Sequence, residues 1–170
     1  MYQRILVPID GSSTSNHGLG EAIRIAKLTQ GRIRLFHVID DLSFALALGS
    51  EPRHADDLLK QLRSEGSRIL GEAQATVQAA GVDVDTRLGD NFPGSVQDKV
   101  AAEALDWGAE LIVLGTHGRR GAARLVLGSG AERILRQAPV PVLLVRAPAG
   151  KDAAAELLQA SASAAAMAAA

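Results

Sequence analysis

The chain has 170 residues, 47% of them hydrophobic, and a formal net charge of −1, so it is long enough for one domain with a sizeable core, and neither intrinsic disorder nor a nucleic-acid partner is indicated. It contains no cysteine, which excludes disulfides, thiol catalysis and cysteine-bound metals. The sequence shows no signal peptide and no apolar run near the ~18 residues of a membrane span, so we expect a cytoplasmic protein with no membrane partner.

Short apolar runs alternate with helical periodicities along the chain. Runs rich in β-branched residues predict strands, and apolar positions three and four apart predict helices. The predicted strands cover residues 4–9, 32–39, 82–88, 110–114 and 140–146. The predicted helices cover residues 15–29, 54–80, 93–107 and 131–137, and the third of them opens at Pro93, because proline is tolerated in a first turn. Gly66 and Gly71 are each expected to weaken the second helix, by up to ~1 kcal/mol relative to alanine.

The alternation of strands and helices predicts a parallel sheet joined by right-handed crossovers, in the α/β class. The run 32–39 is mostly apolar, as in a strand buried on both faces. The run 82–88 alternates, with charged residues on one face, and 140–146 contains Pro141, so both belong at sheet edges. The order 3-2-1-4-5 satisfies these constraints and describes a doubly wound, five-stranded parallel sheet with helices on both faces.

The crevice of such a sheet opens where the crossovers diverge, at the carboxyl ends of the first and fourth strands. Two turn-rich segments follow these strands, Asp10-Gly11-Ser12 and the segment that starts at Gly115. We therefore expect both segments to contribute to one site.

The segment from Gly115 to Ser129, GTHGRRGAARLVLGS, has the composition of a phosphate-binding loop. Glycine after a strand lets the backbone approach a ligand closely, and a helix N-terminus offers N–H donors and about half a positive charge to an anion. The spacing is G-x2-G-x9-G-S, and the chain has neither a Walker A pattern nor GxGxxG. We predict a phosphate-binding loop that differs from those of the P-loop and the usual dinucleotide-binding proteins.

Taken together, these motifs resemble the universal stress protein family. The resemblance covers residues 1–146 and includes Pro8 and Asp10 around the end of the first strand, HVID at 37–40, the GTHG turn, the Gly128-Ser129 pair and the closing VPVLLV. It implies an adenine nucleotide alpha hydrolase-like fold that binds ATP or another adenine nucleotide, with or without Mg²⁺.

The resemblance also implies site residues, position by position. Pro8 and Val38 match positions that line the adenine pocket, and Asp10 matches the acidic residue that approaches the ribose or a magnesium ion. The loop that wraps the ribose and phosphates corresponds to Leu114, Gly115, Gly118, Gly128 and Ser129, with Gly130 next to them. The resemblance implies a homodimer through strand 140–146, which would otherwise leave an unpaired apolar edge, and a further protein partner that the sequence does not identify.

Two of these residues have a purely structural alternative. Ser129 and Glu132 form the S-x-x-E pattern of a capping box, although the glycines before it favour phosphate contact. Asp10 suits a turn or a cap as well as a ligand. His117 is interpreted as a loop residue beside the nucleotide, and no residue is assigned a catalytic role. A solvated basic patch is predicted from Arg119, Arg120 and Arg124.

Three functions stay open. We favour an ATP-binding regulatory module in stress response; the second is a slow ATPase or autokinase with Ser129 or a nearby hydroxyl as phosphoacceptor. The third is a nucleotide-free interaction module, because Gly130 and Ala131 stand where ATP-binding relatives carry a β-branched and a hydroxyl residue. The alanine-rich residues 147–170 are interpreted as a mobile tail or an expression artefact outside the domain at 1–146.

Overall fold

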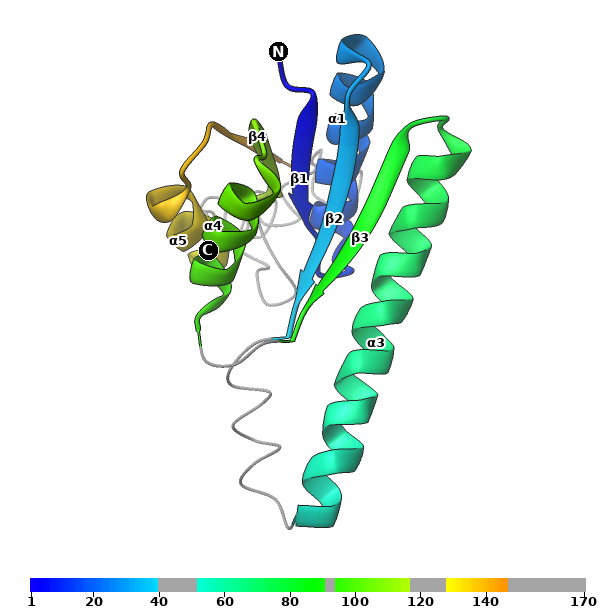
Figure 1. Ribbon diagram of the computed structural model, residues 1–170, viewed down its shortest axis with the longest axis vertical. Coiled ribbons are helices and arrows are strands. Elements are labelled where there is room, and N and C mark those ends of the chain that lie inside the picture. The colour runs from blue at the N-terminus through cyan, green and yellow to red at the C-terminus, as the bar shows by residue number, and fades with distance from the viewer. Residues whose placement is uncertain (40–51, 91–93, 117–127, 147–170) are drawn as a thin grey trace, which may run out of the picture.

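The computed structural model of the chain describes residues 1–39, 52–90, 94–116 and 128–146 (Figure 1). Strands and helices alternate along these residues, as predicted. The elements are β1 (Arg4–Pro8), α1 (Ser13–Thr29), β2 (Arg32–Val38), α3 (Pro52–Ala79), β3 (Asp83–Gly89), α4 (Val96–Trp107), β4 (Leu111–Gly115), α5 (Ser129–Gln137) and β5 (Val142–Val145). Within the described residues, none of the helices combines the length and apolarity that a membrane span requires.

The five strands form one parallel sheet in the order β3-β2-β1-β4-β5. This confirms the predicted strand order and the doubly wound α/β class. The central strand β1 pairs with β2 on one side and β4 on the other, and Ile5 is opposite Ile33 and Leu111. Among the described strands β3 pairs only with β2 and β5 only with β4, so these two strands are the edges.

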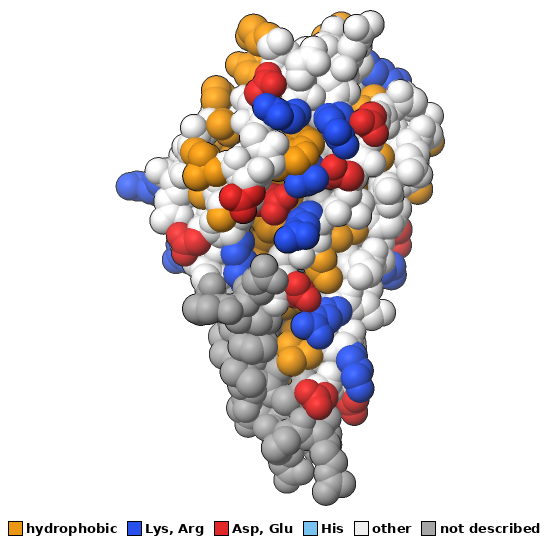
Figure 2. Space-filling model, viewed as in Figure 1, with side chains coloured by type: hydrophobic (Ala, Val, Ile, Leu, Met, Phe, Trp, Pro, Cys, Tyr) orange, Lys and Arg blue, Asp and Glu red, His pale blue; other side chains and the backbone are white. Residues whose placement is uncertain are grey.

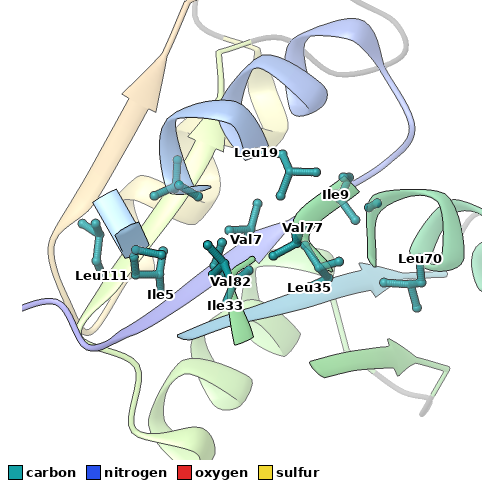
Figure 3. Packing of buried hydrophobic residues seen from close by; sticks show 14 of the residues in the cluster. Ile5, Val7, Ile9, Leu19, Ile33, Leu35, Leu70, Val77, Val82 and Leu111 are labelled. Atoms are coloured by element: carbon teal, nitrogen blue, oxygen red, sulfur yellow. The ribbon is translucent and has the colours of Figure 1, made fainter. Parts of the chain in front are cut away.

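Each face of the sheet packs against two helices. One core lies under α1 and α3, where Val7 and Leu35 of the sheet meet Leu19 and Val77 of the helices (Figure 3). The second core lies under α4 and α5, which bury Val100, Ala104 and Ile134 against the other face. The helices therefore cover both faces, as the predicted class requires.

All four helices begin two or three residues away from their predicted starts, and hydrogen bonds to a serine explain two of these differences. The side chain of Ser12 accepts a hydrogen bond from the Ser15 N–H, so α1 begins at Ser13 rather than at residue 15. The predicted start of α4 at Pro93 is wrong, because Ser95 and Asp98 form a capping box and the helix begins at Val96. A Ser-x-x-Asp pattern, rather than the proline, sets this start.

The charged face of β3 is neutralised within the molecule. Asp85 accepts hydrogen bonds from Arg34 at 2.6 and 2.9 Å, and Arg34 also donates to Glu103 of α4 at 2.8 Å. The Arg34 guanidinium lies 4.7 Å from the ring centroid of Trp107, within range of a cation–π contact. Side chains of both signs are interleaved on the face of the molecule shown in Figure 2. The edge strand β3 is therefore tied to both β2 and α4.

The helix α3 is much longer than the strands it covers and extends past the carboxyl end of β3 (Figure 1). Its glycines differ in their surroundings. A methyl group at Gly71 would meet no atom within 4 Å, whereas one at Gly66 would lie 2.7 Å from Leu88 and 2.8 Å from His37. Gly66 is therefore a packing position, although the sequence marked it only as a weak point in the helix.

The capping box makes stability depend on acid pH. Hydrogen bonding from the Ser95 hydroxyl lowers the pKa of Asp98 below its ordinary value of 3.8. A carboxyl whose pKa is lowered by folding stabilises the protein above its unfolded pKa, and that contribution disappears as the pH falls from about 4 through the folded pKa. We expect the urea midpoint of wild type to exceed that of Asp98→Asn at pH 7, with the difference vanishing at strongly acid pH. A difference that is the same at both pH values would contradict this assignment.

Candidate functional site

The predicted site residues gather at the carboxyl edge of the sheet. The strands β1, β2 and β4 are parallel neighbours, so their last residues lie along one edge. This edge carries Pro8 and Asp10 from β1 and the turn after it, Val38 from β2, Leu114 and Gly115 from β4, and Gly128, Ser129 and Gly130 at the start of α5. Gly118 and His117, with Arg119, Arg120 and Arg124, lie outside the described residues.

Asp10 occupies a tight turn between β1 and α1. Its Oδ1 accepts a hydrogen bond from the Ser12 N–H at 3.0 Å, and Gly11 between them has a φ of 79°, in the left-handed region. Ser12 in turn caps α1. Asp10 therefore acts as a turn residue, as one of the two interpretations predicted. Its contact with a ribose or a metal ion stays a prediction. Within the described residues, no group of three or more acidic or histidine side chains is placed to hold a metal ion.

Gly115 allows the backbone of β4 to touch the first turn of α1. A methyl group at Gly115 would lie 2.6 Å from the carbonyl carbon and oxygen of Thr14. One at Gly18, a turn further along α1, would lie 3.2 Å from the Gly115 nitrogen. The two glycines allow the N-terminus of α1 to pack directly against the end of β4. Packing alone therefore requires glycine at position 115, whether or not a ligand binds there.

The N-terminus of α5 is anchored to the same edge. The Gly128 N–H donates to the Thr116 carbonyl at 2.8 Å, and the first hydrogen bond of the helix runs from the Glu132 N–H to the Gly128 carbonyl at 2.9 Å. The N–H groups of Ser129, Gly130 and Ala131 precede that bond and so have no acceptor within the helix. The start of α5 thus presents a cluster of backbone donors.

The capping-box alternative for Ser129 is wrong. The N-cap residue is Gly128, no side chain caps this helix, and Ser129 is the first residue of the helix itself. Glu132 instead accepts a hydrogen bond from Arg136, one turn along, at 3.0 Å. The side chain of Ser129 is exposed at the helix start.

Val38 directs its peptide groups toward the end of β1. In a parallel strand, successive residues direct their N–H and C=O groups to opposite neighbours. The Ile39 N–H donates to Gly89 of β3, so the N–H and C=O of Val38 point the other way. Among the described residues, the last backbone hydrogen bond between β1 and β2 runs from the Ile9 N–H to the Phe36 carbonyl, at 2.9 Å. The peptide groups of Val38 therefore point toward the turn after β1, beyond the end of that ladder.

The side chains at this edge are less available than the backbone. Leu114 is buried in the core under α4 and α5, so only its main chain can reach a ligand. Pro8 is half-buried, and Val38 packs partly against the same core. The described part of this edge is thus lined mainly by peptide groups.

The sequence did not identify His37 as part of this arrangement. It is buried, and its Nδ1 lies 2.8 Å from the Ile9 carbonyl, the residue before Asp10. Because a carbonyl accepts, Nδ1 carries the proton in this contact. Its position in HVID, next to a residue expected in the base pocket, was the only signal in the sequence.

Comparisons with known proteins agree on one family. A family model described as "Universal stress protein family" matches residues 1–146. A universal stress protein of Methanocaldococcus jannaschii is 32% identical over 149 residues, which are 87% of this chain and 84% of that protein. A crystal structure of a universal stress protein family member from Burkholderia pseudomallei is 34% identical, with a TM-score of 0.68 over 86% of this chain and 97% of that one.

A more distant structure shows the shared fold alone. It is a universal stress protein from Archaeoglobus fulgidus in complex with dAMP, 21% identical, with a TM-score of 0.62 over 85% of this chain and 98% of that one.

Substitution by alanine should change stability in opposite directions at Gly115, which is closely packed, and at Gly130, which has open space around it. Gly115→Ala forces α1 away from β4 and lowers the free energy of unfolding by about 1–3 kcal/mol. Gly130→Ala meets no atom within 4 Å and raises that free energy, by less than about 1 kcal/mol, because alanine is the better helix former. Urea denaturation of both variants checks this, and equal effects would contradict the packing role of Gly115.

Proposed function

The chain belongs to the universal stress protein family, and we propose that it binds an adenine nucleotide at the carboxyl edge of β1, β2 and β4. In this proposal the nucleotide controls how the protein interacts with a further protein partner in the stress response. The observation that carries it is that one edge offers two sets of backbone groups, one suited to a base and one to a phosphate.

The peptide of Val38 is complementary to adenine. An extended residue presents one N–H donor and one C=O acceptor on the same side of the strand. Adenine presents a ring-nitrogen acceptor beside an amino donor, whereas guanine presents two acceptors, N7 and O6, on the corresponding edge. A site that reads a base through Val38 therefore favours adenine over guanine.

The start of α5 suits a phosphate. The N–H groups of Ser129, Gly130 and Ala131 have no acceptor within the helix, and a helix N-terminus carries roughly half a positive charge. Asp10 would repel a phosphate, so we place it beside the ribose, where a carboxylate accepts hydrogen bonds from hydroxyl groups, or in contact with Mg²⁺. ATP is the nucleotide that we favour.

A carboxylate at position 130 tests the phosphate subsite. In Gly130→Asp, like charges about 5 Å apart oppose binding by roughly 1 kcal/mol or more, so affinity for ATP and AMP falls at least about fivefold. The same acidic residue in a first turn stabilises the helix, so weaker binding here cannot be attributed to unfolding. Titration calorimetry of wild type, Gly130→Asp and Gly130→Ala checks this, with ATP, AMP and GMP, with and without Mg²⁺. Unchanged affinity in Gly130→Asp would remove phosphate from α5, and no heat with millimolar ATP or AMP in wild type would end the nucleotide proposal.

We further propose that two chains pair through β5. All four of its residues are apolar and half-buried, and among the described strands it pairs with β4 alone. A two-fold axis through this edge would pair β5 with its copy, necessarily antiparallel, and continue the sheet across both chains.

The hydrogen bonds of β5 show which residues would face the partner. The carbonyls of Pro141 and Val145 accept from Ile112 and Thr116 on the β4 side, so Val142 and Leu144 direct their N–H groups outward.

Proline at position 144 tests the dimer. Leu144→Pro removes an outward N–H without removing a bond to β4, so it blocks pairing between chains while the strand order within one chain persists. Leu144→Ala loses a similar side chain but keeps the donor. We expect wild type and Leu144→Ala to be dimers and Leu144→Pro a monomer in size-exclusion chromatography with light scattering. A monomeric wild type would contradict the proposal.

A further inference from the structure

The hydrogen-bond ladder between β1 and β2 is interrupted by a side chain. After the bond from the Ile9 N–H to the Phe36 carbonyl, the next bond of a regular parallel ladder would run from the Val38 N–H to the Ile9 carbonyl. In the structure the Ile9 carbonyl accepts from His37 Nδ1 instead, at 2.8 Å. The imidazole thus satisfies the buried carbonyl that Val38 would otherwise satisfy.

We propose that His37 is a positioning residue that holds the Val38 N–H open to the crevice, where it donates to a ring nitrogen of the nucleobase. This inference rests on the proposed nucleotide function. Without His37, the Ile9 carbonyl would recruit the Val38 N–H, because a buried carbonyl without a donor is costly. The Val38 N–H would then bond to the Ile9 carbonyl and would no longer be available to a nucleobase.

The imidazole is buried and held between the Ile9 carbonyl and α3. His37 is 8% exposed. Its Nδ1 donates to the Ile9 carbonyl, and its ring lies beside Gly66 of α3. A methyl group at Gly66 would lie 2.8 Å from His37 Cδ2 and 2.7 Å from Leu88 Cδ1. Gly66 therefore provides the space that the ring occupies.

The same contact controls the residue that we place beside the ribose. Ile9 directly precedes Asp10, so a hydrogen bond that fixes the Ile9 carbonyl also fixes where the Asp10 turn begins. One side chain thereby sets both the Val38 peptide and the start of the Asp10 turn.

The first measurement needs no variant. Amide hydrogen exchange by NMR on the nucleotide-free protein compares Val38 with Phe36, whose N–H points the same way but lies within the ladder. We expect the Val38 amide to exchange at least about a hundredfold faster than the Phe36 amide. Equal protection of the two amides would overturn the proposal, whether or not the protein binds a nucleotide.

Two substitutions of nearly equal shape then test the donor. In His37→Asn the amide nitrogen can replace Nδ1, whereas His37→Leu offers no donor to Ile9. We expect His37→Leu to slow exchange of the Val38 amide and to weaken AMP and ATP binding, each by at least about tenfold, and His37→Asn to restore much of both. Loss of binding with the Val38 amide still exposed would overturn the proposal, as would wild-type affinity in His37→Leu.

A pair of glycine variants displaces the ring without changing its chemistry. Gly66→Ala drives a methyl group into the imidazole and should weaken nucleotide binding by roughly tenfold, whereas Gly71→Ala, in the same helix with open space around it, should leave binding unchanged. Equal effects of the two variants would count against His37. Failure of wild type to bind any adenine nucleotide would end the proposed function, while the exchange comparison of Val38 with Phe36 would still decide what His37 does.

Discussion

The pairing of β1 with neighbours on both sides is the constraint on which the rest of the structure depends. Ile5 and Leu6 are fully buried, and β1 bonds to β2 in one direction and β4 in the other. Because the chain leaves β1 first toward one side and later toward the other, the two halves of the sheet diverge at its carboxyl end. The close approach of Gly115 to Thr14 then fixes how near the helix after β1 comes to the strand of the other half.

The two edge strands of the sheet, β3 and β5, differ in the character of their side chains. On β3, acidic residues are held by Arg32 and Arg34 of β2, and a charged edge resists pairing with another chain. On β5 the residues are apolar, and the residue with a missing N–H, Pro141, precedes the strand. In the proposed dimer β5 would be the pairing edge, and the charged β3 edge would disfavour growth beyond two chains by edge pairing.

Strand order and class could be predicted from the sequence because apolar runs and charge alternation are local signals. The start of α4 and the cap of α5 were not predicted, because two short patterns compete at each. At α4 the local capping box of Ser95 and Asp98 prevails over Pro93, and at α5 Gly128, whose N–H donates to the Thr116 carbonyl, takes the cap position instead of Ser129. Gly66 and His37 are far apart in the sequence, so their proximity could not be predicted from local patterns. By local propensity Gly66 only weakens α3, but in the structure the lack of a side chain there leaves room for the His37 ring. The residues at the carboxyl edge were identified by family resemblance, and their packing partners by the structure.

The stacking of Arg34 on Trp107 has a consequence for spectroscopy. Trp107 is the only tryptophan of the chain, and it lies at the end of α4 next to Gly108, which approaches the Arg4 side chain at the amino end of β1. The indole therefore lies near the amino ends of the strands, away from the proposed nucleotide site at their carboxyl ends. Tryptophan fluorescence would then report the separation of α4 from β2 during unfolding and change little if a nucleotide binds at the proposed site, so one optical signal would distinguish folding from binding.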